Sequence, residues 1–88
     1  MTWLVEIDEQ ARRELRELDP QVQREILRYL RERTATDDDP KRFGKALTGE
    51  KLGLWRYRVG DYRIVCRIES AKLTVVVLRT AHRREVYG

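Results

Sequence analysis

Residues 54–68 read LWRYRVGDYRIVCRI, and their alternation of side-chain types predicts a β-hairpin. Gly60-Asp61 has the composition of a two-residue turn between two strands. The register that follows from this turn pairs Val59 with Tyr62, Arg58 with Arg63 and Tyr57 with Ile64.

The predicted hairpin has one apolar face and one arginine-rich face, because successive side chains of a strand point to opposite sides. The apolar face carries Trp55, Tyr57, Val59, Tyr62, Ile64, Cys66 and Ile68. The opposite face carries Arg56, Arg58, Arg63 and Arg67, together with Val65 and Glu69.

An arginine pair placed directly across two strands is repulsive, so Arg58 opposite Arg63 carries a local cost that a bound anion would relieve. Arginine suits this purpose because its planar, permanently charged fork matches phosphate or carboxylate. The alternative interpretation is a solvated face whose arginines keep the protein soluble or pair with an acidic partner. We favour anion binding because the arginines converge across strands.

Length and charge restrict the possible functions. Eighty-eight residues predict one domain, residues 1–88, with a single core and a shallow surface site. Residues 1–40 hold seven basic and eleven acidic side chains, and residues 41–88 hold twelve and four. The two halves therefore carry net charges of −4 and +8, which favours a polyanion or an acidic partner for the second half.

Cofactor, metal and membrane functions lack support in the sequence. One histidine and one cysteine cannot build a zinc site, and Cys66 falls on the predicted core side of its strand. No stretch approaches the roughly 20 apolar residues needed to span a bilayer, and no signal segment is recognisable. We therefore expect a cytoplasmic protein with no cofactor.

The remaining segments predict an α+β fold with the order β-α-α-β-β-β. Residues 3–7 alternate as in a short strand, and Ala11, Leu15 and Leu18 recur at helical spacing. Asp19-Pro20 starts a second helix. Residues 41–53 have the composition of a connector. The apolar run of residues 73–78 is typical of a buried strand. A turn at Ser70-Ala71 would complete a three-strand antiparallel meander, with the helices on one face of the sheet. Its register would pair Ile68 with Leu73, Cys66 with Val75 and Ile64 with Val77.

The C-terminal residues add reactive groups within possible reach of the arginine-rich side of the predicted hairpin. These groups are His82, Arg83 and Tyr87. Metal-free RNA cleavage needs a base for the 2′-hydroxyl, positive charge at the phosphorus and an acid for the departing 5′-oxygen. Nearby guanidinium groups would lower the pKa of a tyrosine, and histidine exchanges protons near neutral pH. The alternative is that His82 is an ordinary surface residue and Tyr87 packs its ring on the sheet.

Three motifs together resemble the RelE/ParE toxin superfamily across nearly the whole chain. They are KALTG at residues 45–49, LWRYRVGDYRIV at residues 54–65 and HRREVY at residues 82–87. The resemblance implies a toxin of a type II toxin–antitoxin system. The RelE branch cleaves mRNA in the ribosomal A site without metal, whereas the ParE branch inhibits DNA gyrase without chemistry of its own.

The resemblance also implies roles for individual residues and partners. Arg63 matches a phosphate-stabilising arginine, Tyr87 the catalytic tyrosine and Arg83 the arginine after the last strand. The best-known RelE sequence has lysines where Arg56 and Arg58 stand, so the proton-accepting role passes to Tyr87 or His82. Lys45, Arg56, Arg58 and Arg67 are the expected substrate-binding residues. The implied partners are a RelB-like antitoxin, the ribosome with mRNA, and operator DNA only through the antitoxin complex.

Overall fold

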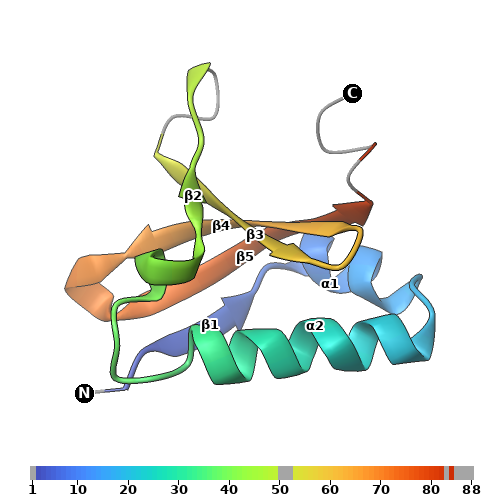
Figure 1. The fold of residues 1–88 in the computed structure, drawn as a ribbon, viewed down its shortest axis with the longest axis horizontal. Coiled ribbons are helices and arrows are strands. Elements are labelled where there is room, and N and C mark those ends of the chain that lie inside the picture. The colour runs from blue at the N-terminus through green and yellow to red at the C-terminus, as the bar shows by residue number, and fades with distance from the viewer. Residues whose placement is uncertain (1, 50–52, 83, 85–88) are drawn as a thin grey trace.

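The structure is a computed structural model that describes residues 2–49, 53–82 and 84. Two helices pack on one face of a five-stranded sheet (Figure 1). The elements in chain order are β1 (Leu4–Ile7), α1 (Glu9–Arg16), α2 (Pro20–Arg33), the 3₁₀ helix η1 (Pro40–Phe43), β2 (Lys45–Ala46), β3 (Leu54–Val59), β4 (Tyr62–Glu69), the 3₁₀ helix η3 (Ser70–Lys72) and β5 (Thr74–His82).

The sheet has the strand order β1-β5-β4-β3-β2. Its centre is the expected antiparallel meander of β3, β4 and β5, and the α+β class with helices on one face is confirmed. Two additions make the sheet mixed and larger than predicted. β1 pairs in parallel with β5, and β2 pairs with β3 inside the segment that we expected to be a connector.

The central hairpin has the predicted register. Gly60 takes a left-handed conformation, φ +58°, in the two-residue turn between β3 and β4. All three predicted cross-strand pairs are present: Val59 with Tyr62, Arg58 with Arg63, and Tyr57 with Ile64.

The predicted register between β4 and β5 was wrong. The turn is η3 followed by Leu73, which is in the left-handed region at φ 46°, so the connection is longer than two residues. Ile68 therefore faces Val75 and Cys66 faces Val77, two positions further along β5 than predicted. A shift of two residues keeps these side chains on the core face, because the side-chain period of a strand is two.

A second irregularity in β5 has a larger effect. Val65 pairs with Arg79 and Cys66 pairs with Val77, which leaves Leu78 without an opposite residue on β4. One extra residue in a strand exchanges the faces of all residues that follow it. Thr80, opposite Ile64, consequently points to the helices, and its hydroxyl donates to the carbonyl oxygen of Ala11 at 3.3 Å.

The second helix begins as its sequence predicts, and it ends at Arg33. The Asp19 carboxylate accepts from the backbone N–H of Gln21 at 2.9 Å, and Pro20 occupies the first turn. Thr34 caps the C-terminal end, and its buried hydroxyl donates to the carbonyl oxygen of Leu30 at 2.6 Å.

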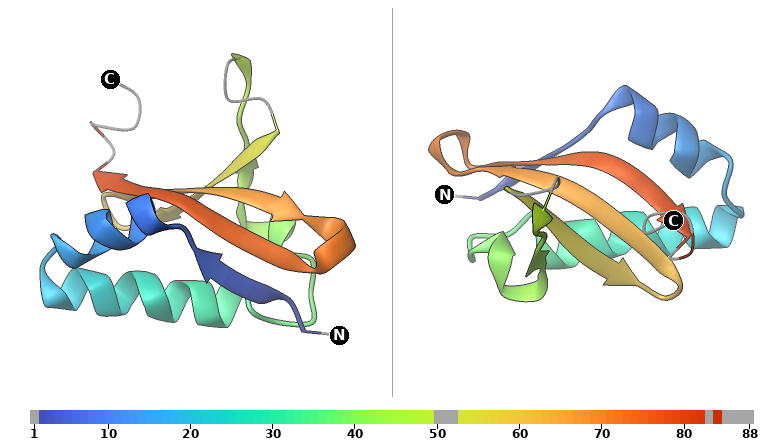
Figure 2. Two further views of the ribbon diagram at one scale, coloured as in Figure 1. Left: turned by 180° about the vertical axis from the view of Figure 1, so that it is seen from behind. Right: turned by 90° about the horizontal axis from the view of Figure 1, so that it is seen from above.

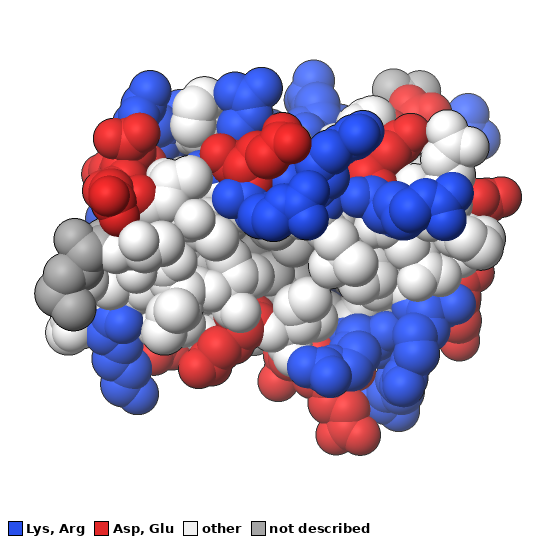
Figure 3. Space-filling view, turned by 90° about the horizontal axis from the view of Figure 1, so that it is seen from below, with Lys and Arg blue, Asp and Glu red and all other residues white. Residues whose placement is uncertain are grey.

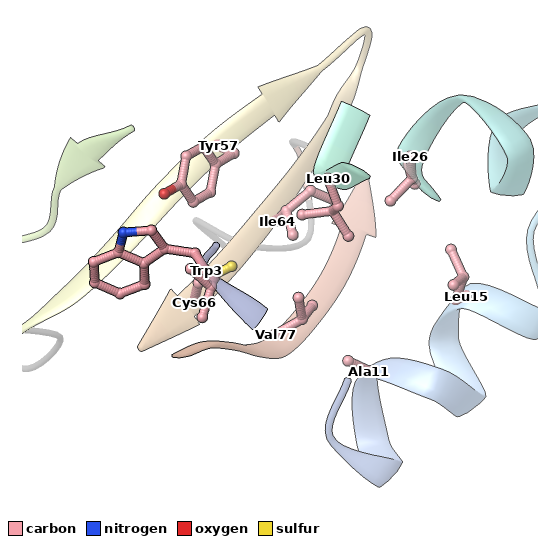
Figure 4. Close-up of a cluster of buried hydrophobic side chains, with 10 residues drawn as sticks. Trp3, Ala11, Leu15, Ile26, Leu30, Tyr57, Ile64, Cys66 and Val77 are labelled. Atoms are coloured by element: carbon pink, nitrogen blue, oxygen red, sulfur yellow. The ribbon is translucent and has the colours of Figure 1, made fainter. Parts of the chain in front are cut away.

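The core lies between the helices and the sheet (Figure 4). Tyr57 is fully buried there, and its hydroxyl donates to the carbonyl oxygen of Pro40 at 2.6 Å, which ties η1 to the sheet. Cys66 is also fully buried, as predicted, and burial raises the pKa of its thiol far above the ordinary value. A thiol held neutral in this way serves packing, because the nucleophile would be the thiolate.

Candidate functional site

The face of the sheet opposite the helices is the arginine face, which we define by Lys45, Arg56, Arg58 and Arg63. Seen from above, β3, β4 and β5 lie in front of α2 (Figure 2, right). The hairpin register places these side chains on this face, since Tyr57 and Ile64 point into the core. Lys45 is the cross-strand neighbour of Arg56, so β2 adds a fourth cation.

An apolar cluster forms the floor of the arginine face. It consists of Leu47, Val65 and Ala81, with Leu54 partly buried against them. Val65 pairs with Arg56 on β3, and Ala81 pairs with Arg63, so the apolar side chains lie directly beside the cations. A surface of this composition fits a ligand with both a negative charge and a flat or apolar part, such as a nucleotide.

Arg63 is the most unusual residue of this face. Only 8% of its surface is exposed, although it lies opposite a second arginine, Arg58. Among the described residues, its Nε has no hydrogen-bond partner. A buried donor without an acceptor lowers the stability of the fold, and a charged donor lowers it further. An anionic oxygen at this point would remove the cost, so Arg63 is the centre of the candidate site.

Arg67 is separated from this group. It lies four residues beyond Arg63 on β4, opposite Leu54. Its Nε donates to Glu69 Oε2 at 3.0 Å, and Lys72 Nζ lies 3.6 Å from Glu69 Oε1. The hydrogen bond from Arg67 lowers the pKa of the Glu69 carboxyl. Glu69 therefore partly neutralises Arg67, and the structure does not bring this arginine to the Arg58–Arg63 pair.

His82 lies on the other side of the sheet. It pairs with Tyr62, whose ring packs against the core, and the two rings meet edge to face with centroids 5.5 Å apart. A pocket of about 360 Å³ next to these rings is also lined by Glu14 and Glu17 of α1. The structure thus places His82 on the helix side, away from Arg63. Arg83 and Tyr87 lie outside the described residues.

Sequence reasoning did not identify Ala81 and Leu47 as parts of the site. Ala81 reaches the arginine face only because Leu78 shifts the register of β5, and simple alternation from Val77 would have placed it in the core. Leu47 follows β2, within the segment expected to be a connector. Val65 was correctly placed beside the arginines by the hairpin pattern.

Metal binding and membrane crossing were the two other kinds of site considered for the described part of the chain. None of its histidine, cysteine and acidic side chains form a group of three or more that could hold a metal ion. No helix within residues 2–49, 53–82 and 84 has the length and apolarity that a membrane crossing requires.

The fold and the site define a small α+β protein with a cationic face on its sheet. The family described as "ParE toxin of type II toxin-antitoxin system, parDE" matches residues 5–87. The chain is 34% identical to Toxin RelG of Mycobacterium tuberculosis, over 99% of this chain and 98% of that protein. It therefore belongs to the ParE toxin family, within the RelE/ParE superfamily that its motifs resemble, and is a toxin of the type II toxin–antitoxin class.

Solved structures agree with this assignment. The toxin–antitoxin complex RelBE2 from Mycobacterium tuberculosis contains a chain that superposes with a TM-score of 0.86 at 32% identity, covering 94% of this chain and 100% of that one. The archaeal RelE–RelB complex from Pyrococcus horikoshii gives a TM-score of 0.72 at 26% identity, covering 94% and 97%.

Proposed function

We propose that this toxin is a ribosome-dependent endoribonuclease that cleaves mRNA in the A site without a metal ion. The observation that carries the proposal is Arg63, which is buried, opposite Arg58, with an Nε that lacks an acceptor among the described residues. A scissile phosphate beside Arg63 would supply that acceptor. Negative charge grows on the phosphate oxygens as the phosphorane forms, so a preorganised guanidinium stabilises the transition state more than the ground state.

In the proposed reaction, the 2′-oxygen attacks the adjacent phosphorus and the bond to the 5′-oxygen breaks. The products are a 2′,3′-cyclic phosphate, which can open to a 3′-phosphate, and a 5′-hydroxyl end. Tyr87, as its phenolate, takes the 2′-hydroxyl proton, and a water molecule gives a proton to the departing 5′-oxygen. The hydroxide left by that water takes the proton back from Tyr87. Lys45, Arg56, Arg58 and Arg83 hold the backbone. We assign the base to Tyr87 because arginine does not release its proton at working pH and His82 lies on the other face.

Gyrase inhibition is the second candidate, because the matching family is that of ParE toxins. The test maps mRNA 5′ ends after brief induction in cells and measures supercoiling by gyrase with the purified protein. We expect new 5′ ends inside translated codons and unaffected gyrase. Intact mRNA together with inhibited or trapped gyrase would assign the chain to the gyrase inhibitors.

We also propose a RelB-like antitoxin as partner, and an apolar groove on the helix side as one part of its binding surface. The groove has a volume of about 420 Å³ and lies between β1 and α2. Its rim includes Leu4, 62% exposed, and Leu27, 43% exposed. Arg24, Arg28 and Arg31 extend along α2 beside Leu27. Figure 3 shows a band of uncharged atoms between two rows of charged side chains on this side. An acidic, amphipathic segment fits this combination of surfaces.

Leu27→Glu should weaken antitoxin binding at least about tenfold, because it places a carboxylate in an apolar contact. Calorimetric titration of the toxin with its antitoxin measures the effect. Gln10→Glu, which adds the same charge at an exposed position of α1, is the matched control and should bind normally. Equal affinities for the two variants would contradict a binding role for this groove.

A further inference from the structure

The end of β5 is held by three contacts, two with α1 and one with β4. The Glu14 side chain accepts from the backbone N–H of Thr80 at 3.0 Å and from Arg79 Nε at 2.8 Å. Two residues further on, His82 meets the ring of Tyr62 edge to face. These contacts fix the last residues of β5 against α1 and β4.

His82 also contacts the backbone that follows the strand. Its Nδ1 lies 3.3 Å from the backbone nitrogen of Arg84 and accepts a hydrogen bond from it. Such a bond requires an unprotonated Nδ1, which means a neutral imidazole with its proton on Nε2. When Nδ1 takes up a proton it becomes a donor, and the bond to the Arg84 N–H is lost.

We infer that His82 is a positioning residue, which holds the Arg84 backbone beside the end of β5 by accepting from its N–H. This role replaces the proton-transfer role that the sequence suggested, because His82 lies on the face opposite Arg63. The consequence for catalysis rests on the proposed function, since Tyr87 follows Arg84 by three residues. The hydrogen bond itself does not depend on that function.

The surroundings of His82 determine how the contact responds to pH. Tyr62 of β4 packs against the ring, and Glu14 and Glu17 of α1 line the adjoining pocket. Glu14 is already engaged by Arg79 and the Thr80 N–H. Protonated His82 would lose Arg84 as a donor, while its new positive charge would face the carboxylates of α1. Acidification should thus release the Arg84 backbone and leave the imidazole on the helix side.

The direct test records amide and imidazole resonances of the whole chain by nuclear magnetic resonance between pH 5 and 8. The Arg84 amide should shift with the same midpoint as the His82 ring. His82→Asn, whose amide oxygen can replace Nδ1 as acceptor, should retain the Arg84 amide position and remove its pH dependence. His82→Phe keeps a ring beside Tyr62 but has no acceptor, and should speed hydrogen exchange of the Arg84 amide about fivefold. An Arg84 amide whose chemical shift does not change when the His82 ring is protonated would overturn the inference.

Single-turnover cleavage on programmed ribosomes gives the functional test. His82→Asn should stay within about threefold of wild type, whereas His82→Phe should fall about tenfold or more because the Arg84 backbone is no longer held. Equal losses of about a hundredfold or more in both variants would instead indicate proton transfer by His82. If the wild-type protein does not cleave mRNA, the proposed function fails, and the resonance measurements still decide the positioning role.

Discussion

Arg63→Ala should slow ribosome-dependent mRNA cleavage by about 10²–10³-fold, the usual effect of removing one preorganised donor from a charged transition state. Arg63 is the residue that the site arrangement singles out, since it is buried and its Nε lacks an acceptor among the described residues. Arg63→Lys should recover part of the rate, because it keeps the charge and loses the planar fork. Initial rates on programmed ribosomes measure both effects.

The free energy of unfolding of Arg63→Ala should not fall together with its cleavage rate. Removing Arg63 relieves the repulsion with Arg58 and removes a buried donor that has no described acceptor, so the free energy of unfolding should be unchanged or higher. The matched control is Arg16→Ala, an exposed arginine of α1 on the helix side, which should cleave normally. Full activity of Arg63→Ala, or an equal loss in both variants, would contradict the assignment.

Ile64→Ala, one residue along the same strand, should show the opposite behaviour. Ile64 is fully buried against the helices, and truncating such a side chain lowers the free energy of unfolding by about 2–5 kcal/mol. This is a large part of the stability of so small a domain. Urea unfolding followed by circular dichroism measures the change, and Ile68→Ala, at a partly buried position of β4, should cost less.

The two neighbouring substitutions together separate folding from function. A loss below about 1 kcal/mol in Ile64→Ala would mean that the core is not organised around β4 as described. At temperatures where Ile64→Ala remains folded, its cleavage rate should be close to that of wild type, because Ile64 does not reach the arginine face.

The hairpin could be predicted from the sequence because its contacts are local. A two-residue turn with a left-handed glycine leaves a single register, and alternation then assigns every side chain of β3 and β4 to a face. The Arg58–Arg63 pair and the place of Val65 followed directly from this. Asp19-Pro20 predicted the start of α2 for a similar local reason.

The remaining features depend on contacts that alternation does not encode. The parallel pairing of β1 with β5 joins residues about 70 positions apart, and no turn specifies it. The unpaired Leu78 changes the face of every later residue of β5, which is why His82 could not be placed correctly. Arg67 had the expected face, but its hydrogen bond to Glu69 depends on side-chain geometry that the pattern leaves open.

The decisive measurement of ribosome-dependent cleavage uses the purified protein and a defined mRNA, with and without ribosomes that hold a chosen codon in the A site. We expect cuts within that codon only when ribosomes are present, with 5′-hydroxyl and cyclic or 3′-phosphate ends, and cleavage slowed by about 10²–10³-fold with Arg63→Ala. Intact mRNA under the same conditions, or cleavage that leaves 5′-phosphate ends, would contradict it.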